Sequence, residues 1–270
     1  MRMNVANPLS ARRPRGGESP AKTIWGADFE LWGPDCPLEP GVWRDRIGGL
    51  EVECVGSGDW FRDADGYVGV SKADVCWAEW SAASGVDAKV CLTHFTAART
   101  LVIVAKDYVG PDGKWVPLIS YRSGTGDYHL AYRASHLSQN VAEMAYYASN
   151  GIDMRTYGRP YVNNSTKPPA IFAQYAYRDP AGVNRLTKRG LTANNNATWT
   201  AEQVNVSSAY HAGVLSNRRI LSRALNIGGS WIGRTAARST AILSIAGCEG
   251  LPDPQLLKDW TATLPGVTWP

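Results

Sequence analysis

The sequence contains no apolar run near the length of about 20 residues that a membrane-spanning helix requires, so we expect no membrane partner. Residues 1–23 also lack the apolar segment of a secretory signal, because proline, glycine, serine and arginine are frequent there. These two absences predict a protein that folds in a cytoplasm and does not use the general secretory route.

The usual zinc-binding pattern is missing as well. The five cysteines are widely spaced, and no two of them form a C-x-x-C pair: Cys36, Cys54, Cys76, Cys91 and Cys248. An odd, scattered set of this kind argues against a zinc site and favours reduced, partly buried thiols.

Motifs of several common catalytic sites are also absent. The four histidines are dispersed without an H-x-x-x-H pair, and neither a G-x-S-x-G turn nor a G-x-x-x-x-G-K-[ST] loop occurs. The stretch DADGY at 63–67 has the character of a turn. It is only a weak signal for calcium, because the later ligands of an EF-hand loop are missing after it.

Excess positive charge is confined to the N-terminal segment. Of the 28 basic and 24 acidic residues, residues 1–23 hold five and one, which leaves a formally neutral chain from residue 24 onward. We therefore predict a basic extended arm at 1–23 and a single folded domain at 24–270, with no nucleic acid on the folded domain. The arm is either a disordered solubilising tail or a segment that a partner orders. Its candidate docking residues are Arg12, Arg13, Arg15 and Lys22.

Beyond the arm, the chain has the pattern of short strands separated by turns. The run RTLVIVAKDYV at 99–109 is apolar on both faces, which is typical of a central strand. A Gly-Pro-Asp-Gly turn after it predicts a hairpin of 101–109 with 114–121, and a Gly-Thr-Gly-Asp turn predicts the next hairpin. Only 252–264 has a helical pattern, with four apolar residues on one face: Leu256, Leu257, Trp260 and Leu264. Many short strands without helices between them predict an all-β fold, an antiparallel two-sheet sandwich with a short C-terminal helix.

Two segments carry a resemblance to a known fold family: ELWGPDCPLEPGVWRDRIGGLEVE and LNIGGSWIGRTAARSTAILSIAGCEGLPDPQLLKDW. From residue 28 to residue 264, the chain resembles the concanavalin A-like, laminin-G-like jelly-roll modules found in many bacterial and phage proteins. In those modules a tryptophan and an aspartate precede a glycine turn, and here these residues are Trp43, Asp45, Gly48 and Gly49. The resemblance implies a jelly-roll in which Trp43 plugs a corner and Asp45 caps the turn.

The same resemblance bears on catalysis. Glucanases of this fold carry an E-x-D-x-E strand, whose alternate carboxylates face the sugar. The nearest match here is Glu51-Val-Glu53, which lacks the third acid. We therefore predict that the protein is not an enzyme and uses no cofactor. Some laminin-G-like modules bind a single structural calcium ion, but no residue of this sequence is assigned to one.

A polar face on the middle strands is the candidate binding surface. Alternation in LISYR, YHLAYR and AIFAQYAYR places the tyrosines toward the core and five polar residues on the opposite, exposed face of a sheet: Arg122, His129, Arg133, Gln174 and Arg178. Their guanidinium and amide groups suit hydrogen bonds to a glycan or to a neighbouring subunit. The alternative is an ordinary solvated face.

Together these features favour a non-enzymatic virion protein, a structural or decoration protein of a bacteriophage head or tail. Such a protein would be assembled in the host cytoplasm, dock on capsid or tail subunits through its arm, and present a lectin-like sandwich to host glycans. The 11 tryptophans and 12 tyrosines also favour a homo-oligomer. Two alternatives stay open: a cellular carbohydrate-binding lectin-like protein, and a glycoside hydrolase of the same fold.

Overall fold

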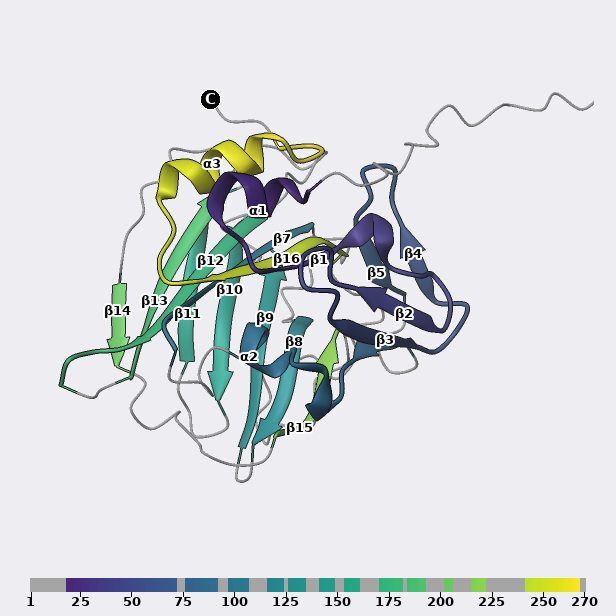
Figure 1. Ribbon diagram of the computed structural model, residues 1–270, viewed down its shortest axis with the longest axis horizontal. Coiled ribbons are helices and arrows are strands. Elements are labelled where there is room, and N and C mark those ends of the chain that lie inside the picture. Colours follow the sequence, from purple (N-terminus) through teal and green to yellow (C-terminus); the bar gives the residue numbers. More distant parts are fainter. Residues whose placement is uncertain are drawn as a thin grey trace, which may run out of the picture.

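The computed structural model packs two antiparallel β-sheets against each other, with short helices beside them (Figure 1). The predicted all-β sandwich with a short C-terminal helix is therefore confirmed. The structure describes residues 18–71, 76–91, 97–106, 116–123, 126–134, 141–148, 153–160, 170–181, 184–192, 202–205, 215–221 and 241–267, with few side chains between 116 and 205.

Sheet A has the strand order β14-β13-β12-β7-β16-β5-β4, and β1 also pairs with β16. Its strands are β1 (Phe29–Trp32), β4 (Trp60–Arg62), β5 (Val68–Val70), β7 (Arg99–Lys106), β12 (Ala170–Arg178), β13 (Asn184–Thr192), β14 (Glu202–Asn205) and β16 (Ala241–Glu249).

Sheet B has the strand order β11-β10-β9-β8-β15-β6-β3-β2. Its strands are β2 (Gly41–Arg44), β3 (Glu51–Val55), β6 (Trp77–Glu79), β8 (Val116–Ser123), β9 (Gly126–Ala134), β10 (Val141–Ala148), β11 (Asp153–Pro160) and β15 (Leu215–Ile220). Short helical turns connect some of these strands: η1 (Gly33–Asp35), η2 (Ala82–Ser84) and α2 (Asp87–Val90).

The main core lies between the two sheets. One row of successive cross-strand partners in sheet B is apolar and buried: Cys54, Ala78, Ile220 and Ile119. Residues directly opposite each other in a ladder point to the same side of the sheet, so this row defines the inner face of sheet B. From sheet A, Leu101 and Ile103 of β7 join the same apolar cluster.

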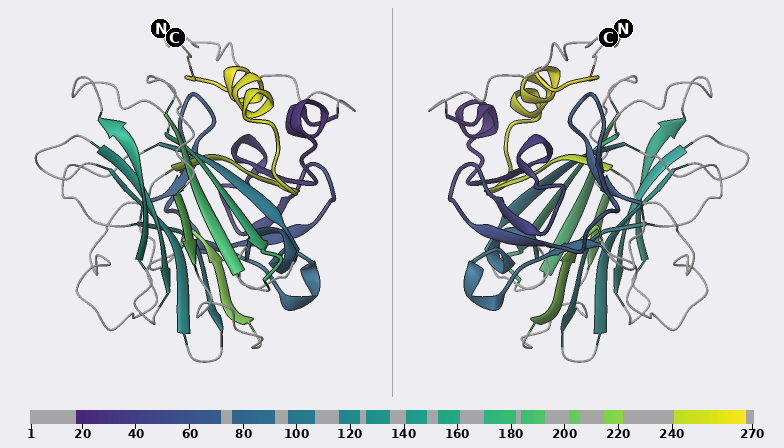
Figure 2. Two further views of the ribbon diagram at one scale, coloured as in Figure 1. Left: turned by 90° about the vertical axis from the view of Figure 1, so that its left-hand side faces the viewer. Right: turned by 90° about the vertical axis from the view of Figure 1, so that its right-hand side faces the viewer.

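A second apolar cluster covers the outer face of sheet A. Helices α1 (Pro20–Trp25) and α3 (Pro254–Ala262) lie side by side there (Figures 1 and 2), and the rings of Trp25 and Trp260 are 5.4 Å apart. Val102 and Val104 of β7 face this cluster, while their neighbours Leu101 and Ile103 face the core. Both faces of β7 are therefore buried, as its apolar run predicts.

The C-terminal helix begins where its sequence favours a start. Asp253 accepts a hydrogen bond from the backbone N of Gln255 at 2.7 Å, and Pro254 occupies the first turn. Leu257, Trp260 and Leu264 are buried as predicted, whereas the prediction is wrong for Leu256, which is 40% exposed. In the part of the chain that the structure describes, no helix has the length and apolar character needed to cross a membrane.

The structure differs from the predicted boundary of the N-terminal arm. Helix α1 contains residues 20–23, and Ala21 and Trp25 are buried in the cluster beside α3. Lys22, one of the candidate docking residues, therefore belongs to the folded body, where its ammonium group pairs with Glu18 at 2.8 Å. A helix of six residues is too short to show an apolar period in the sequence. The candidates Arg12, Arg13 and Arg15 lie outside the described residues.

One predicted hairpin is wrong. Strands β7 and β8 do not pair, because β7 lies in sheet A between β12 and β16, and β8 lies in sheet B between β9 and β15. The connection between them therefore passes from one sheet to the other. The hairpin of β8 with β9 is confirmed, with Ser123 opposite Gly126.

Candidate functional site

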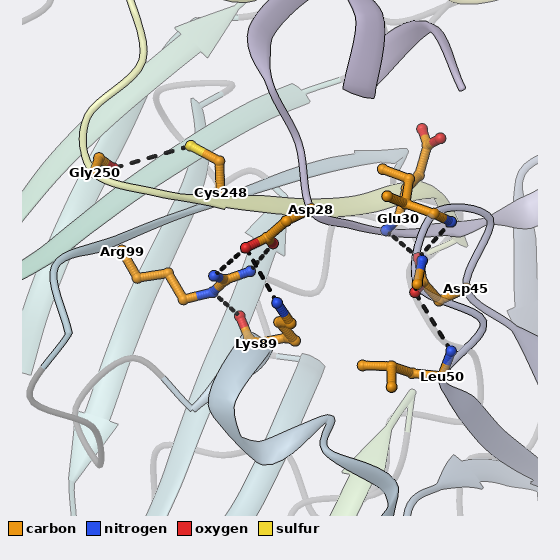
Figure 3. Close-up of polar contacts among 10 residues, drawn as sticks. Asp28, Glu30, Asp45, Leu50, Lys89, Arg99, Cys248 and Gly250 are labelled. Carbon is orange, nitrogen blue, oxygen red and sulfur yellow. Dashed lines mark hydrogen bonds and ion pairs between the residues drawn. The ribbon is translucent and has the colours of Figure 1, made fainter. Parts of the chain in front are cut away.

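The glycine turn after β2 is organised by a buried carboxylate (Figure 3). Asp45 is 3% exposed and accepts hydrogen bonds from the backbone N of Glu30 at 2.7 Å, of Ile47 at 3.0 Å and of Gly48 at 2.7 Å. Trp43 is fully buried, and its indole N donates to the carbonyl of Trp32 at 2.9 Å. The expected structural roles of Trp43 and Asp45 are therefore confirmed.

Glu30 is a second buried carboxylate near this turn. Its oxygens accept hydrogen bonds from the hydroxyl of Ser19 at 2.5 Å and from that of Ser244 at 3.2 Å. Burial raises the pKa of Glu30, and the two hydroxyls and the charge of Arg46 only partly offset this effect. Both carboxylate oxygens thus have partners inside the protein, and Ser19 links the start of α1 to β1.

Asp28 holds together three segments through ion pairs (Figure 3). The guanidinium of Arg99 donates through two nitrogens to the Asp28 carboxylate, and Lys89 Nζ lies 3.1 Å from the same carboxylate. Burial raises the pKa of Asp28, but Arg99 and Lys89 outweigh this effect and hold that pKa below its ordinary value. The cluster connects the residue directly before β1 with α2 and β7.

The DADG stretch is a turn, as its residue types indicate. Asp63 accepts hydrogen bonds from the backbone N of Asp65 at 3.0 Å and of Tyr67 at 2.8 Å. The ammonium of Lys106 contacts both carboxylates, at 3.3 Å from Asp63, and lies 4.2 Å from the Tyr67 ring centroid. Lys106 is thus the positively charged partner of both Asp63 and Asp65.

The five residues of the predicted binding face do not share one face. Arg122 lies on β8 and His129 and Arg133 lie on β9, all in sheet B, whereas Gln174 and Arg178 lie on β12 in sheet A. The side chains of Arg122, His129, Arg133 and Arg178 are outside the described part of the structure.

For Gln174 the predicted orientation is wrong. Gln174 is 3% exposed and lies opposite Leu101, a core residue of β7, so it faces the interior between the sheets. Tyr175 and Tyr177 belong to the other face of β12, where their rings stack at 5.0 Å. Because β12 carries buried residues on both faces, polarity alone does not tell which face is inward.

A polar row that no pattern in the sequence indicates crosses the outer face of sheet B. Glu53 of β3 lies opposite Glu79 of β6, Glu79 opposite Arg219 of β15, and Arg219 opposite Ser120 of β8. This row alternates with the buried apolar row of the same strands, so Glu53, Glu79 and Arg219 point away from the core, whereas Ser120 is fully buried. The next position in the row is that of His129, opposite Ser120 on β9.

The described side chains of this face interact closely. Trp77 donates from its indole N to Glu79 Oε2 at 2.7 Å, and the guanidinium carbon of Arg219 lies 4.2 Å from the Trp77 ring centroid. Arg219 Nε lies 3.9 Å from Glu79 Oε2, beyond hydrogen-bond distance. We call Glu53, Trp77, Glu79 and Arg219 the sheet B polar patch.

The sheet B polar patch contains two carboxylates but one guanidinium group. Glu53 is exposed and has no ion-pair partner among the described residues, whereas Glu51 on the same strand pairs with Arg44 at 2.7 Å. The alternation at 51–53 is visible in the sequence, but no pattern there indicates the register that brings Glu79 beside Glu53. An indole face, carboxylate acceptors and a guanidinium donor together suit a ligand with many hydroxyl groups.

Comparisons with known proteins show only distant likeness. No family model matches the chain, and no curated protein matches it. Among solved structures, a sialidase of Trypanosoma rangeli in complex with sialic acid has 13% identity and a TM-score of 0.44, and the match covers 85% of this chain and 32% of the sialidase. This chain thus spans about a third of that protein's length.

Two phage structures give similar values. The enzymatically active domain of tailspike protein 2 of bacteriophage CBA120 has 10% identity and a TM-score of 0.42, over 80% of this chain and 31% of that one. The CBM2 module of the evolved Dit of Lactobacillus casei BL23 phage J-1 has 11% identity and a TM-score of 0.39, over 82% of this chain and 94% of the module. Likeness at this level assigns neither an activity nor a family, and it does not confirm the concanavalin A-like resemblance.

The prediction that the protein is not an enzyme is contradicted. The matched structures include a sialidase, an enzymatically active tailspike domain and an alginate lyase of Aplysia kurodai. The prediction rests on a missing motif within one strand. A search along one strand does not detect two carboxylates on neighbouring strands, and Glu53 and Glu79 have that arrangement.

Proposed function

We propose that the protein binds glycans at the sheet B polar patch and that it does so as part of a bacteriophage particle. The observation that carries the first half is the placement of Glu79 between Glu53 and Arg219, beside the indole of Trp77. Sugar hydroxyls donate to carboxylates and accept from guanidinium, and the C–H face of a sugar packs on an indole ring. The proposed binding needs no cofactor.

The electrostatics of the patch support a ligand site. Carboxylates directly opposite each other across a ladder destabilise a sheet, and one arginine between β6 and β8 balances only one of them. Residues kept at a cost to stability are expected where a protein binds a ligand. A ligand hydroxyl group that donates a hydrogen bond to these carboxylates would reduce the repulsion between them.

The second part of the proposal, that the protein belongs to a bacteriophage particle, rests on the distribution of charge along the chain. The excess positive charge lies in the N-terminal segment, and the rest of the chain is formally neutral. Because helix α1 belongs to the folded body, the proposed docking arm is reduced to residues 1–17, whose cations include Arg12, Arg13 and Arg15. A basic arm of this kind would be attracted to a negatively charged capsid or tail surface and would become ordered on binding.

A glycan array tests the binding half directly. The full chain should bind a subset of glycans, and Trp77→Ala and Glu79→Gln should each reduce that signal by tenfold or more, which is about 1.4 kcal/mol. The matched control is Glu51→Gln, because Glu51 is an exposed carboxylate on the same sheet that pairs with Arg44. Equal binding by all four proteins, or no binding by the wild-type chain, contradicts the proposal.

Co-sedimentation with phage particles tests the other half. Removal of residues 1–17 should abolish attachment and leave glycan binding intact. Attachment that survives the truncation would place the docking site on the sandwich.

Glycoside hydrolysis is a second candidate function, favoured by the cross-strand pairing of Glu53 with Glu79. Opposed Cβ atoms lie about 4.5–5.5 Å apart, which is compatible with the separation of about 5–5.5 Å between the carboxyl groups of retaining glycosidases. The two carboxyl groups would share the roles of nucleophile and general acid. Release of reducing sugar by the wild-type chain and its loss in Glu53→Gln would establish hydrolysis, and binding without release would leave the glycan-binding function alone.

A further inference from the structure

Two cysteines that are distant in sequence meet in the core. Cys36 Sγ and Cys54 Sγ lie 3.6 Å apart, and each residue is 1% exposed. Cys36 comes directly after the short helix η1, and Cys54 lies in β3 next to Glu53. Cys36 Sγ also lies 3.3 Å from the carbonyl oxygen of Pro37. The other three cysteines have oxygen contacts as well: Cys76 with the carbonyl of Ser57, Cys91 with the carboxylate of Asp87, and Cys248 with the carbonyl of Gly250.

The backbones on both sides of this pair are held in place. Cys54 lies opposite Gly41 in the ladder of β2 with β3, and the backbone N of Cys36 donates to the carbonyl of Gly33 at 3.0 Å. A disulfide needs a sulfur–sulfur distance of about 2.05 Å, so the two sulfurs must approach by roughly 1.5 Å. Rotation of the two side chains about their Cα–Cβ bonds moves the sulfurs by such a distance without breaking these backbone contacts.

We propose that Cys36 and Cys54 are a disulfide-forming pair, which is reduced in a cytoplasm and becomes cross-linked in an oxidising medium with a glutathione-type disulfide as the oxidant. One cysteine thiolate attacks a sulfur of the glutathione disulfide, which forms a mixed disulfide and releases one glutathione thiolate. The second cysteine thiolate attacks the cysteine sulfur of the mixed disulfide and releases the other glutathione thiolate. The two protons lost by the cysteines end on the two glutathione thiols.

Burial controls when this reaction takes place. Desolvation, together with the neighbouring Cys54, raises the pKa of the Cys36 thiol, so little thiolate forms while the core is closed. Exchange therefore proceeds through local opening or during folding, when the sulfurs are accessible.

The bridge would close a loop that contains the structural turn of the fold. Residues 36–54 include Trp43, Asp45 and all of β2, and Cys54 is the direct neighbour of Glu53 in the sheet B polar patch. Such a cross-link removes conformational freedom from the unfolded chain and therefore raises thermal stability. This inference does not depend on glycan binding, because it requires only the two thiols and the oxidant.

Thiol counting after oxidative refolding tests the proposal. Reduced, unfolded full chain is refolded in an oxidising glutathione buffer, trapped with an alkylating reagent in denaturant, and digested. The thiol count should fall from five to three. One peptide pair should contain Cys36 joined to Cys54, with a mass about 2 Da below that of the two reduced peptides. The Tm of the bridged protein should exceed that of the same protein in reductant by about 5 °C.

Cysteine variants separate the proposed bridge from others. Cys36→Ser should keep all four remaining thiols and show no effect of reductant on its Tm. Cys248→Ala, the matched control with another buried cysteine removed, should still lose two thiols. Five free thiols in the refolded wild-type chain, or a bridge that joins any other pair, overturns the proposal, and the peptide map of the wild-type chain decides this even if a variant fails to fold.

Discussion

Glu53 and Glu79 lie directly opposite each other on β3 and β6, on the face of sheet B that points away from the core. The only charge that the ladder places beside them among the described residues is that of Arg219, on the far side of Glu79. Two negative charges at adjacent cross-strand positions are unfavourable for the sheet itself. We attribute their presence to the ligand that we propose for this face.

Glu53→Gln should therefore stabilise the free protein. Removing one of the two facing charges relieves repulsion, and the expected gain is about 0.2–1 kcal/mol in the free energy of unfolding. Urea denaturation at neutral pH and low salt measures it. The same change at Glu51 should give no gain, because it removes the exposed ion pair with Arg44. A loss of stability in Glu53→Gln would show that this carboxylate has a stabilising partner.

Gln174→Leu should also stabilise the protein, for a different reason. The amide of Gln174 is buried, and neither of its polar atoms has a hydrogen-bond partner among the described residues. Leucine has a similar shape and removes the unpaired polar group, with an expected gain of about 1–2 kcal/mol in the free energy of unfolding. If Gln174 instead served the exposed face that the sequence predicts, the substitution would leave stability unchanged and weaken ligand binding.

Glu30 should make stability depend on pH. Its pKa is raised in the folded protein above the ordinary value of 4.5, so the folded state binds the proton more tightly than the unfolded state. The stability that protonated Glu30 contributes to the free energy of unfolding is present below pH 4.5 and is lost as the pH rises through the pKa of Glu30 in the folded state. Glu30→Gln should remove this loss, and urea denaturation between pH 4.5 and about pH 8 compares the two proteins. If the free energy of unfolding of the wild-type chain and of Glu30→Gln depended on pH in the same way, Glu30 would be excluded as the cause of the loss of stability.

Two N-terminal truncations should behave differently. Removal of residues 1–17 should leave the free energy of unfolding unchanged within about 0.5 kcal/mol. Removal of residues 1–25 also deletes the buried Ala21 and Trp25, and this should cost about 3–5 kcal/mol because the Trp260 ring loses its neighbour. Thermal and urea unfolding measure both. Equal stability of the two truncated chains would contradict the packing of α1 on the body.

The parts of the fold that could be predicted from sequence are those with local chemistry. The turn at Asp45, the cap at Asp253 and the doubly buried β7 are explained by residue types and alternation within a few positions. The connection from β7 to β8 could not be predicted in this way, because a turn sequence does not tell whether the next strand returns to the same sheet.

The candidate site depends on long-range register instead. Glu53 and Glu79 are separated by 26 positions in the sequence, and only the ladder of β3 with β6 brings them together. The predicted place of Gln174 is wrong because its strand is covered on both faces, so that a polar residue does not mark the solvent side.

Calorimetric titration of the best glycan from the array into the wild-type chain and into Glu79→Gln tests the central claim most directly. Glutamine can still accept the hydrogen bond of Trp77, so the fold of the patch should persist while the charge is lost. We predict a Kd at least tenfold higher for Glu79→Gln, with Glu51→Gln within twofold of wild type. Equal Kd values for Glu79→Gln and the wild-type chain would contradict glycan binding at the sheet B polar patch.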